Sequence, residues 1–166
     1  MKNLIITAVG TDKPGLVNKI TSIINENNGN IDNSKMIKIK DQFAMIIDFY
    51  LSSNLNEIKN QFSKIKDLKI SYMEIKKPDS SKNNIKTYLI KGADDQGIIN
   101  KISEYLSNKN INIIEVDTFI NAAPITGAPL FNLKITIENN QLINFNELNV
   151  KLTNICDNLN LDIKLL

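Results

Sequence analysis

Two spacings of apolar residues divide the first half of the chain into strands and helices. Residues 4–9 form a short, β-branched apolar run that ends at Gly10, which predicts a strand. Asp12 is a typical N-cap residue and Pro14 is typical of a first helical turn, so we expect a helix to begin at these residues. The Asn and Gly residues at 27–29 predict the end of this helix. The positions between them place apolar residues on one helical face: Leu16, Ile20, Ile23 and Ile24.

The following segment alternates with the period of two that is typical of strands. Strands are predicted over residues 31–40 and 43–51, joined by a turn at Asp41 and Gln42. A second helix is predicted over residues 55–65 and a last strand over 68–76. The order is therefore βαββαβ. The alternation places on one face of the second hairpin strand Phe43, Met45, Ile47, Phe49 and Leu51.

The second half of the chain repeats the first at a constant offset. Residues 10–20 align with 92–102 as Gly-x-Asp-x-x-Gly, two aliphatic residues and Asn-Lys-Ile, and the alignment continues without a gap to Asn30-Ile31 against Asn112-Ile113. A duplicated domain explains such a repeat. The equivalent strands are predicted over residues 85–91, 112–121, 130–138 and 161–166, and the helices over 96–108 and 145–159.

We therefore predict an α+β protein with two tandem ferredoxin-like βαββαβ domains. The N-terminal domain spans residues 1–77 and the C-terminal domain spans residues 85–166. Residues 78–84 are polar, begin with Pro78 and lack apolar periodicity, which predicts a linker. Phe131, Leu133 and Ile135 alternate with polar residues, which predicts a helix-covered face and a more polar opposite face in each sheet.

Composition excludes several kinds of chemistry. The chain of 166 residues has a formal net charge of +2, with 42% hydrophobic and 23% charged residues, which is an ordinary globular balance. It contains no His and no Arg, so the commonest general base and metal ligand are missing. The lysines are spread among acidic residues along the whole chain and form no basic stripe, so we expect no direct binding to nucleic acid.

The N-terminal apolar run is too short for a signal peptide or a membrane span, which needs about 18 consecutive apolar residues. We therefore expect a cytoplasmic protein without a membrane segment. Cys156 shares an apolar helix face with Leu152 and Ile155, which predicts a buried side chain without a His to activate it. We expect no catalytic residues, no metal site and no cofactor.

The loop that opens the first helix is the strongest candidate binding site. A helix start presents free backbone N–H groups that suit a carboxylate, and a glycine there allows close approach. In the first half this loop contains Asp12, Pro14, Gly15 and Leu16; in the second half it contains Asp94, Gly97 and Ile98, with Gln96 in place of the proline. A plain capped helix start explains the same residues. If φ of Gly15 is negative, Gly15→Val should block a ligand at little cost in stability.

Two further segments leave alternatives open. Asn30, Ile31 and Asn112 follow the first helix of each half and either end that helix or border the ligand loop of a neighbouring domain. Residues 121–129 form a hairpin loop without a counterpart in the first half. This loop is either a lid or partner contact, or a tolerated insertion.

The residues Asp-Lys-Pro-Gly-Leu-Val at 12–17 and Gly-Asn-Ile at 29–31 resemble the ACT-domain family, and the two-domain layout is similar to the glycine cleavage system transcriptional repressor group. The resemblance implies ferredoxin-like domains that pair and bind amino acids, with glycine as one candidate, at a shared interface. It implies a regulator that acts through a protein partner such as a transcriptional activator; the alternative is a stand-alone regulatory subunit of an amino-acid metabolic enzyme. Free sheet edges also predict pairing, with a homodimer favoured over a monomer.

Overall fold

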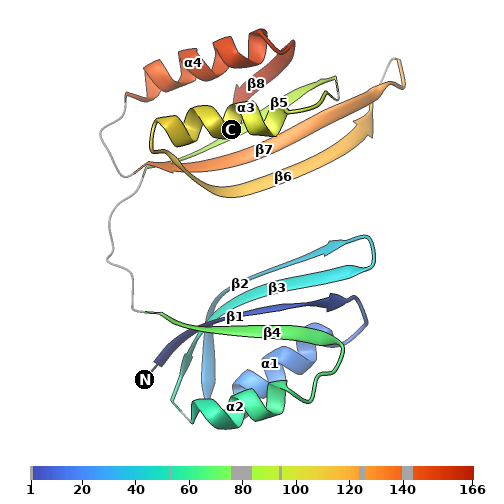
Figure 1. The fold of residues 1–166 in the computed structure, drawn as a ribbon, viewed down its shortest axis with the longest axis vertical. Helices are drawn as coiled ribbons and strands as arrows, with labels where there is room; N and C mark the ends of the chain where they lie inside the picture. The colour runs from blue at the N-terminus through green and yellow to red at the C-terminus, as the bar shows by residue number, and fades with distance from the viewer. Residues whose placement is uncertain (1, 53, 76–83, 94, 124–125, 140–143) are drawn as a thin grey trace. The chain divides into compact units, whose positions relative to one another are not determined.

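The computed structural model describes residues 2–52, 54–75, 84–93, 95–123, 126–139 and 144–166. The chain divides into two compact units, Met1–Asp79 and Ser80–Leu166 (Figure 1). Each unit folds around its own core and is described by itself. None of the helices in the described ranges is long and apolar enough to cross a membrane.

Each unit has the predicted βαββαβ order, which confirms the α+β tandem architecture. The first unit contains β1 (Lys2–Thr11), α1 (Leu16–Glu26), β2 (Gly29–Ile39), β3 (Gln42–Leu51), α2 (Leu55–Phe62) and β4 (Leu68–Ile75). The second contains β5 (Asn84–Ala93), α3 (Ile98–Asn108), β6 (Asn112–Ala122), β7 (Pro129–Asn139), α4 (Phe145–Asp157) and β8 (Leu161–Leu165).

Both sheets are antiparallel and have the same strand order, β2-β3-β1-β4 in the first domain and β6-β7-β5-β8 in the second. Two helices cover one face of each sheet (Figure 1). The first core lies between them and uses the residues whose spacing was noted above. Ile6, Ile20, Phe43, Phe49 and Ile58 are at most 1% exposed.

The second core is built in the same way from Tyr88, Ile90, Leu133, Ile137 and Leu152, each at most 2% exposed. Cys156 is fully buried within this cluster, as predicted. Burial raises the pKa of its thiol to about 11. Cys156 is therefore a core side chain, and its thiolate form is disfavoured at neutral pH.

The predicted starts of α1 and α3 were wrong. The helices begin at Leu16 and Ile98, and their N-caps are Gly15 and Gly97, so Asp12 is not a cap. Gly15 has φ 88°, which lies in the left-handed region. The expectation that Gly15→Val would be tolerated required a negative φ, so that expectation was wrong. The helix C-terminus agrees with the sequence, because Asn27 caps it.

The outer face of the first sheet is more polar than the helix-covered face, as expected, since it includes Thr7, Asp48 and Lys69, but it is not uniformly polar. The face that points away from α1 and α2 carries exposed apolar side chains from all four strands: Val9, Ile37, Ile39, Ile46 and Met73. In the second domain the outward residues of β7 are polar, as expected, yet Asn132 and Thr136 are buried. Hydrogen bonds satisfy them: Asn132 Nδ2 donates to Asn121 Oδ1 at 2.8 Å, and the Thr87 and Thr136 hydroxyls lie 3.1 Å apart.

Candidate functional site

Both domains begin their first helix in the same unusual way. Gly15 (φ 88°, ψ 0°) and Gly97 (φ 84°, ψ 7°) are left-handed N-cap residues, a conformation that glycine adopts without steric cost. Neither helix has a side-chain cap. Because the first N–H groups of an α-helix lack intrahelical acceptors and lie at the positive end of the helix dipole, these two helix starts can accept an anionic group.

The second helix of each domain, in contrast, is capped by a side chain. Asn54 Oδ1 accepts a hydrogen bond from the backbone N–H of Asn56 at 3.0 Å, and Asn144 Oδ1 accepts one from Asn146 at 3.0 Å. Each asparagine therefore satisfies one of the free donors of its own helix. The difference follows the repeat: the second helix of each domain is closed by a side chain, and the first helix of each domain is left open.

Two ion pairs hold the loop ahead of Gly15. The backbone N–H of Asp12 donates to Asp41 O at 2.7 Å, and the Asp12 carboxylate lies 2.6 Å from Lys38 Nζ, so this residue ties the loop to the β2–β3 hairpin. On the other side, Lys13 Nζ lies 2.7 Å from Asp67 Oδ1. The hydrogen bond and positive charge of Lys13 lower the pKa of Asp67.

The loop of the second domain lacks these partners in sequence. Asp95 occupies the position of Lys13, and Asn160 precedes Leu161 where Asp67 precedes Leu68. Asp95 Oδ1 instead accepts a hydrogen bond from the backbone N–H of Gln96 at 2.7 Å. Asp94, the predicted counterpart of Asp12, lies outside the described residues. The two helix starts share a backbone conformation but differ in the charges around them.

The side chains next to the two glycines divide into buried and exposed ones. Leu16 and Ile98 are 2% and 3% exposed and belong to the two cores, so they can offer a ligand only their backbone. Pro14 is exposed. Val17 and Ile99, which the sequence analysis did not select, are each 40% exposed. Their shared place in the repeat, directly after the core residue, is the sequence signal that could have found them.

Asn30 and Ile31 lie at the other end of α1. The helix has 11 residues and is therefore about 16 Å long. Ile31 packs against the core, and exposed Asn30 borders a shallow groove of about 430 Å³ beside α1. Asn112 borders an equivalent groove of about 430 Å³ beside α3. Within one domain the structure thus keeps these residues away from the glycine loop, so a ligand that touches both sets needs two domains.

A wider groove of about 700 Å³ runs between α1 and the end of α2, with Lys19, Lys64 and Lys66 at its rim. Within residues 121–129, the Ala123 N–H donates to Ala128 O at 2.8 Å, while residues 124–125 lie outside the described part. Among the residues that the structure describes, acidic, His and Cys side chains form no group of three or more that could hold a metal ion.

Comparison with known proteins gives a consistent result. Residues 2–68 match the family model of the ACT domain. A UPF0237 protein of Clostridium perfringens is 37% identical over 83 residues, which is 50% of this chain and 81% of that protein. Two solved structures cover 99% of this chain and 96% of their own: an unknown protein from Galdieria sulphuraria (TM-score 0.86, 22% identity) and a protein labelled as a candidate glycine cleavage system transcriptional repressor (TM-score 0.70, 19% identity). At these identities the two structures show the fold alone.

Proposed function

The chain belongs to the family of the UPF0237 proteins, and its residues 2–68 match the ACT domain; from this premise we propose that it is a regulatory protein that binds a small amino acid at its open helix starts. The observation that carries the proposal is the contrast between the helices of each domain. The first helix of both domains starts at a left-handed glycine without a side-chain cap, whereas asparagine caps the second. An amino-acid carboxylate would supply the acceptor that the open helix starts lack.

The two sites are proposed to be unequal. Beside the loop of the first domain the charges balance, because Lys13 pairs with Asp67 and Lys38 pairs with Asp12, whereas Asp95 stands beside Gly97 in the second. A carboxylate is attracted by nearby cations and repelled by nearby anions. The first domain should therefore hold the ligand carboxylate more tightly. Val17 offers an apolar contact next to Gly15 for the rest of the ligand.

The proposed output is contact with a protein partner. A transcriptional regulator that resembles the glycine cleavage repressor group is the favoured form, since a structure with that label shares the fold over nearly the whole chain. The absence of His and Arg from the sequence and the burial of Cys156 support a role without catalysis. The 20 lysines and 18 acidic residues are mixed along the chain, which supports action through a partner protein instead of direct contact with DNA.

A thermal-shift panel of the twenty amino acids tests the proposal. A ligand that binds only the folded state raises its stability by about 2.7 kcal/mol at a concentration of 100 Kd. The blocking variant is Gly15→Asn, because asparagine tolerates left-handed backbone and adds a side chain where no atom lies within 4 Å. Gly127→Asn is the matched control, since Gly127 is also left-handed (φ 68°) with open space around it.

At least one amino acid should raise the melting temperature of the wild type and of Gly127→Asn. The shift should be lost or strongly reduced in Gly15→Asn, and Gly97→Asn should reduce it less. A panel without any stabilising amino acid would contradict the sensing function. A ligand whose shift is unchanged in both the Gly15 and Gly97 variants would retain the function and move the site elsewhere.

A further inference from the structure

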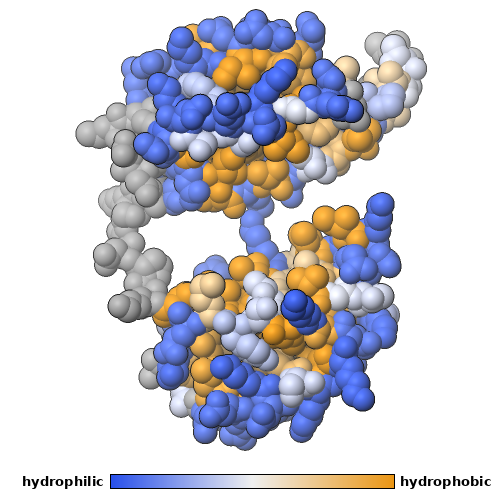
Figure 2. All heavy atoms as spheres, in the orientation of Figure 1, coloured by the Kyte–Doolittle hydropathy of each residue, from blue (hydrophilic) through white to orange (hydrophobic). Residues whose placement is uncertain are grey.

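The helix side of the first domain contains the groove of about 700 Å³ between α1 and the turn that follows α2. One wall is a single face of α1, formed by residues at helical spacing, and the other wall is formed by residues 61–67. Ile23 and Ile65 line the groove and are half-buried against the core, so they give it an apolar floor. Hydrophilic side chains predominate over the helices of this domain in Figure 2.

Bonds at both ends hold the walls of the groove in place. Asn27, which is 4% exposed, donates from Nδ2 to Ile23 O and to Gln61 Oε1, both at 2.8 Å, and so joins the end of α1 to the end of α2. At the other end, Lys13 Nζ lies 2.7 Å from Asp67 Oδ1. A preformed groove loses little conformational entropy when a partner binds, which favours binding.

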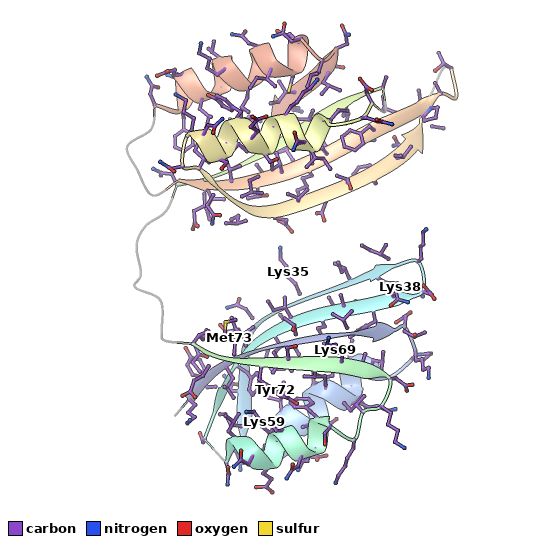
Figure 3. All side chains as sticks on the ribbon, viewed as in Figure 1. Lys35, Lys38, Lys59, Lys69, Tyr72 and Met73 are labelled. Carbon is purple, nitrogen blue, oxygen red and sulfur yellow. The ribbon has the colours of Figure 1, made fainter. Side chains whose placement is uncertain are left out.

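The charges in and beside the groove do not balance. The two carboxylates are Glu26 and Asp67, and Asp67 is already paired with Lys13. Three further lysines line the groove and are exposed: Lys19, Lys64 and Lys66. The lysine within α2 itself, Lys59, lies outside the groove, where its Nζ is 5.4 Å from the centroid of the Tyr72 ring (Figure 3). The groove therefore has an excess of positive charge on both walls.

The equivalent groove of the second domain lacks this excess. It measures about 420 Å³, and its charged lining residues are Lys101 and Glu104. In the repeat, Lys101 matches Lys19, and Glu104 stands where the first domain has Ser22. The end of α4 contributes Asn158 and Leu159 to this groove in place of lysines. Since both domains have the same fold, the fold itself does not require the lysines of the first groove.

We propose that the groove of the first domain docks a short acidic segment of a partner protein, with an apolar side chain between Ile23 and Ile65 and carboxylates at the three exposed lysines. The α1 wall from Asn18 to Glu26 is about 12 Å long, which an extended segment of about four residues covers. Cations spread over two walls around an apolar floor fit spaced carboxylates better than one compact anion. Complementary charge also steers such a partner and excludes basic ones.

This docking would give a surface to the proposed contact with a partner protein. The groove does not include the glycine loop, so its test needs no amino acid and can fail independently of amino-acid sensing. The probes are short synthetic peptides in which Asp and Glu flank Leu, with an uncharged fluorophore, and the full chain is titrated into them at low salt while anisotropy is followed. The acidic peptides should bind, and salt should weaken the binding. Peptides with Asn and Gln in place of the acids should not bind, and peptides with Ser in place of Leu should bind more weakly.

Charge reversal places the peptide in the groove. Lys64→Glu and Lys66→Glu should each weaken binding about fivefold to tenfold, because each removes one attraction and adds one repulsion at an exposed site. Two controls make the same change in net charge: Lys69→Glu on the sheet of the same domain (Figure 3) and Lys101→Glu in the second groove. Both should leave the affinity unchanged, and circular dichroism should show the wild-type fold for all four variants.

Three results would overturn the proposal. The first is that no acidic peptide binds at low salt, even if inorganic phosphate binds in the groove. The second is that the Asn and Gln peptides bind as well as the acidic ones. The third is that Lys64→Glu and Lys66→Glu weaken binding no more than the two controls do.

Discussion

Replacement of Gly10 by alanine tests how the loop ahead of Gly15, the proposed ligand site, is held in place. Gly10 lies near the end of β1, where the turn before β4 passes very close. A Cβ at this position would lie 2.1 Å from the backbone oxygen of Asp67 and 3.0 Å from Leu68 Cδ2. The obstructing atom is backbone, and Leu68 is paired with Gly10 in the sheet, so the turn can yield only by breaking register. Asp67 would then move away from Lys13.

The magnitudes follow from what each new Cβ would meet. Overpacking costs about 1–3 kcal/mol, and Gly10→Ala belongs at about 3 kcal/mol because a backbone atom must move. Gly15→Ala meets no atom within 4 Å, so it should cost only the left-handed penalty, roughly 1–2 kcal/mol. Gly92→Ala meets Leu161 Cδ2 at 2.3 Å and the backbone oxygen of Asn160 at 3.1 Å, and because the closest atom belongs to a side chain, the cost should be about 1–3 kcal/mol and below that of Gly10→Ala.

Urea unfolding at 25 °C, followed by circular dichroism, measures the three variants. Hydrogen exchange of the β1 amides assigns the loss to the first domain for Gly10→Ala and Gly15→Ala. The free energy of unfolding should fall most for Gly10→Ala. If Gly15→Ala is as damaging as Gly10→Ala, then Gly15 is held by packing, and the reasoning that leaves its surroundings open for a ligand is refuted.

Three further predictions concern single side chains. Lys13→Met should raise the pKa of Asp67 toward its usual value of 3.8 in an NMR titration. Because the ion pair lowers the pKa of Asp67 in the folded state, the stability that the Lys13–Asp67 pair contributes is present above the unfolded-state pKa and is lost as pH falls through the folded-state pKa. If Lys13→Met leaves the pKa of Asp67 unchanged, the ion pair is contradicted. Cys156, with a pKa of about 11, should resist a thiol reagent at pH ~8 until urea unfolds the chain, and rapid native labelling would count against its burial. Asn132→Ala removes donors to Asn121 Oδ1 and Leu130 O and should cost about 1–3 kcal/mol in urea unfolding, whereas a negligible change would show that water replaces these bonds.

The sequence predicted the architecture because local signals and burial agree along most of the chain. The starts of α2 and α4 were predicted at the correct residues, since Asn54 and Asn144 cap those helices through their own side chains. The repeat then assigned the second domain from the first. The α1 start failed for a tertiary reason: the Asp12 carboxylate pairs with Lys38 and its N–H donates to Asp41 O, which leaves the cap to a glycine.

The nature of the outer sheet faces could not be predicted from alternation. A period of two determines which residues share a face, but it does not say whether that face meets water. From the sequence, Ile37 and Ile46 are ordinary strand residues. The strand register shows that they lie on the same face, where both are exposed. In the same way, alternation alone predicted that Asn132 faces solvent, but it is buried, and acceptors within the β6–β7 hairpin satisfy it: Asn121 Oδ1 and Leu130 O.

The central claim is that an amino-acid carboxylate binds the open helix starts. An NMR titration with each of the twenty amino acids, followed through the backbone N–H signals, tests it most directly. The account predicts that a binding amino acid shifts the amides of Leu16 and Val17 most, those of Ile98 and Ile99 less, and that of capped Asn56 least. Shifts that leave Leu16 and Val17 unmoved while a ligand binds elsewhere, or no response to any amino acid, would contradict the account.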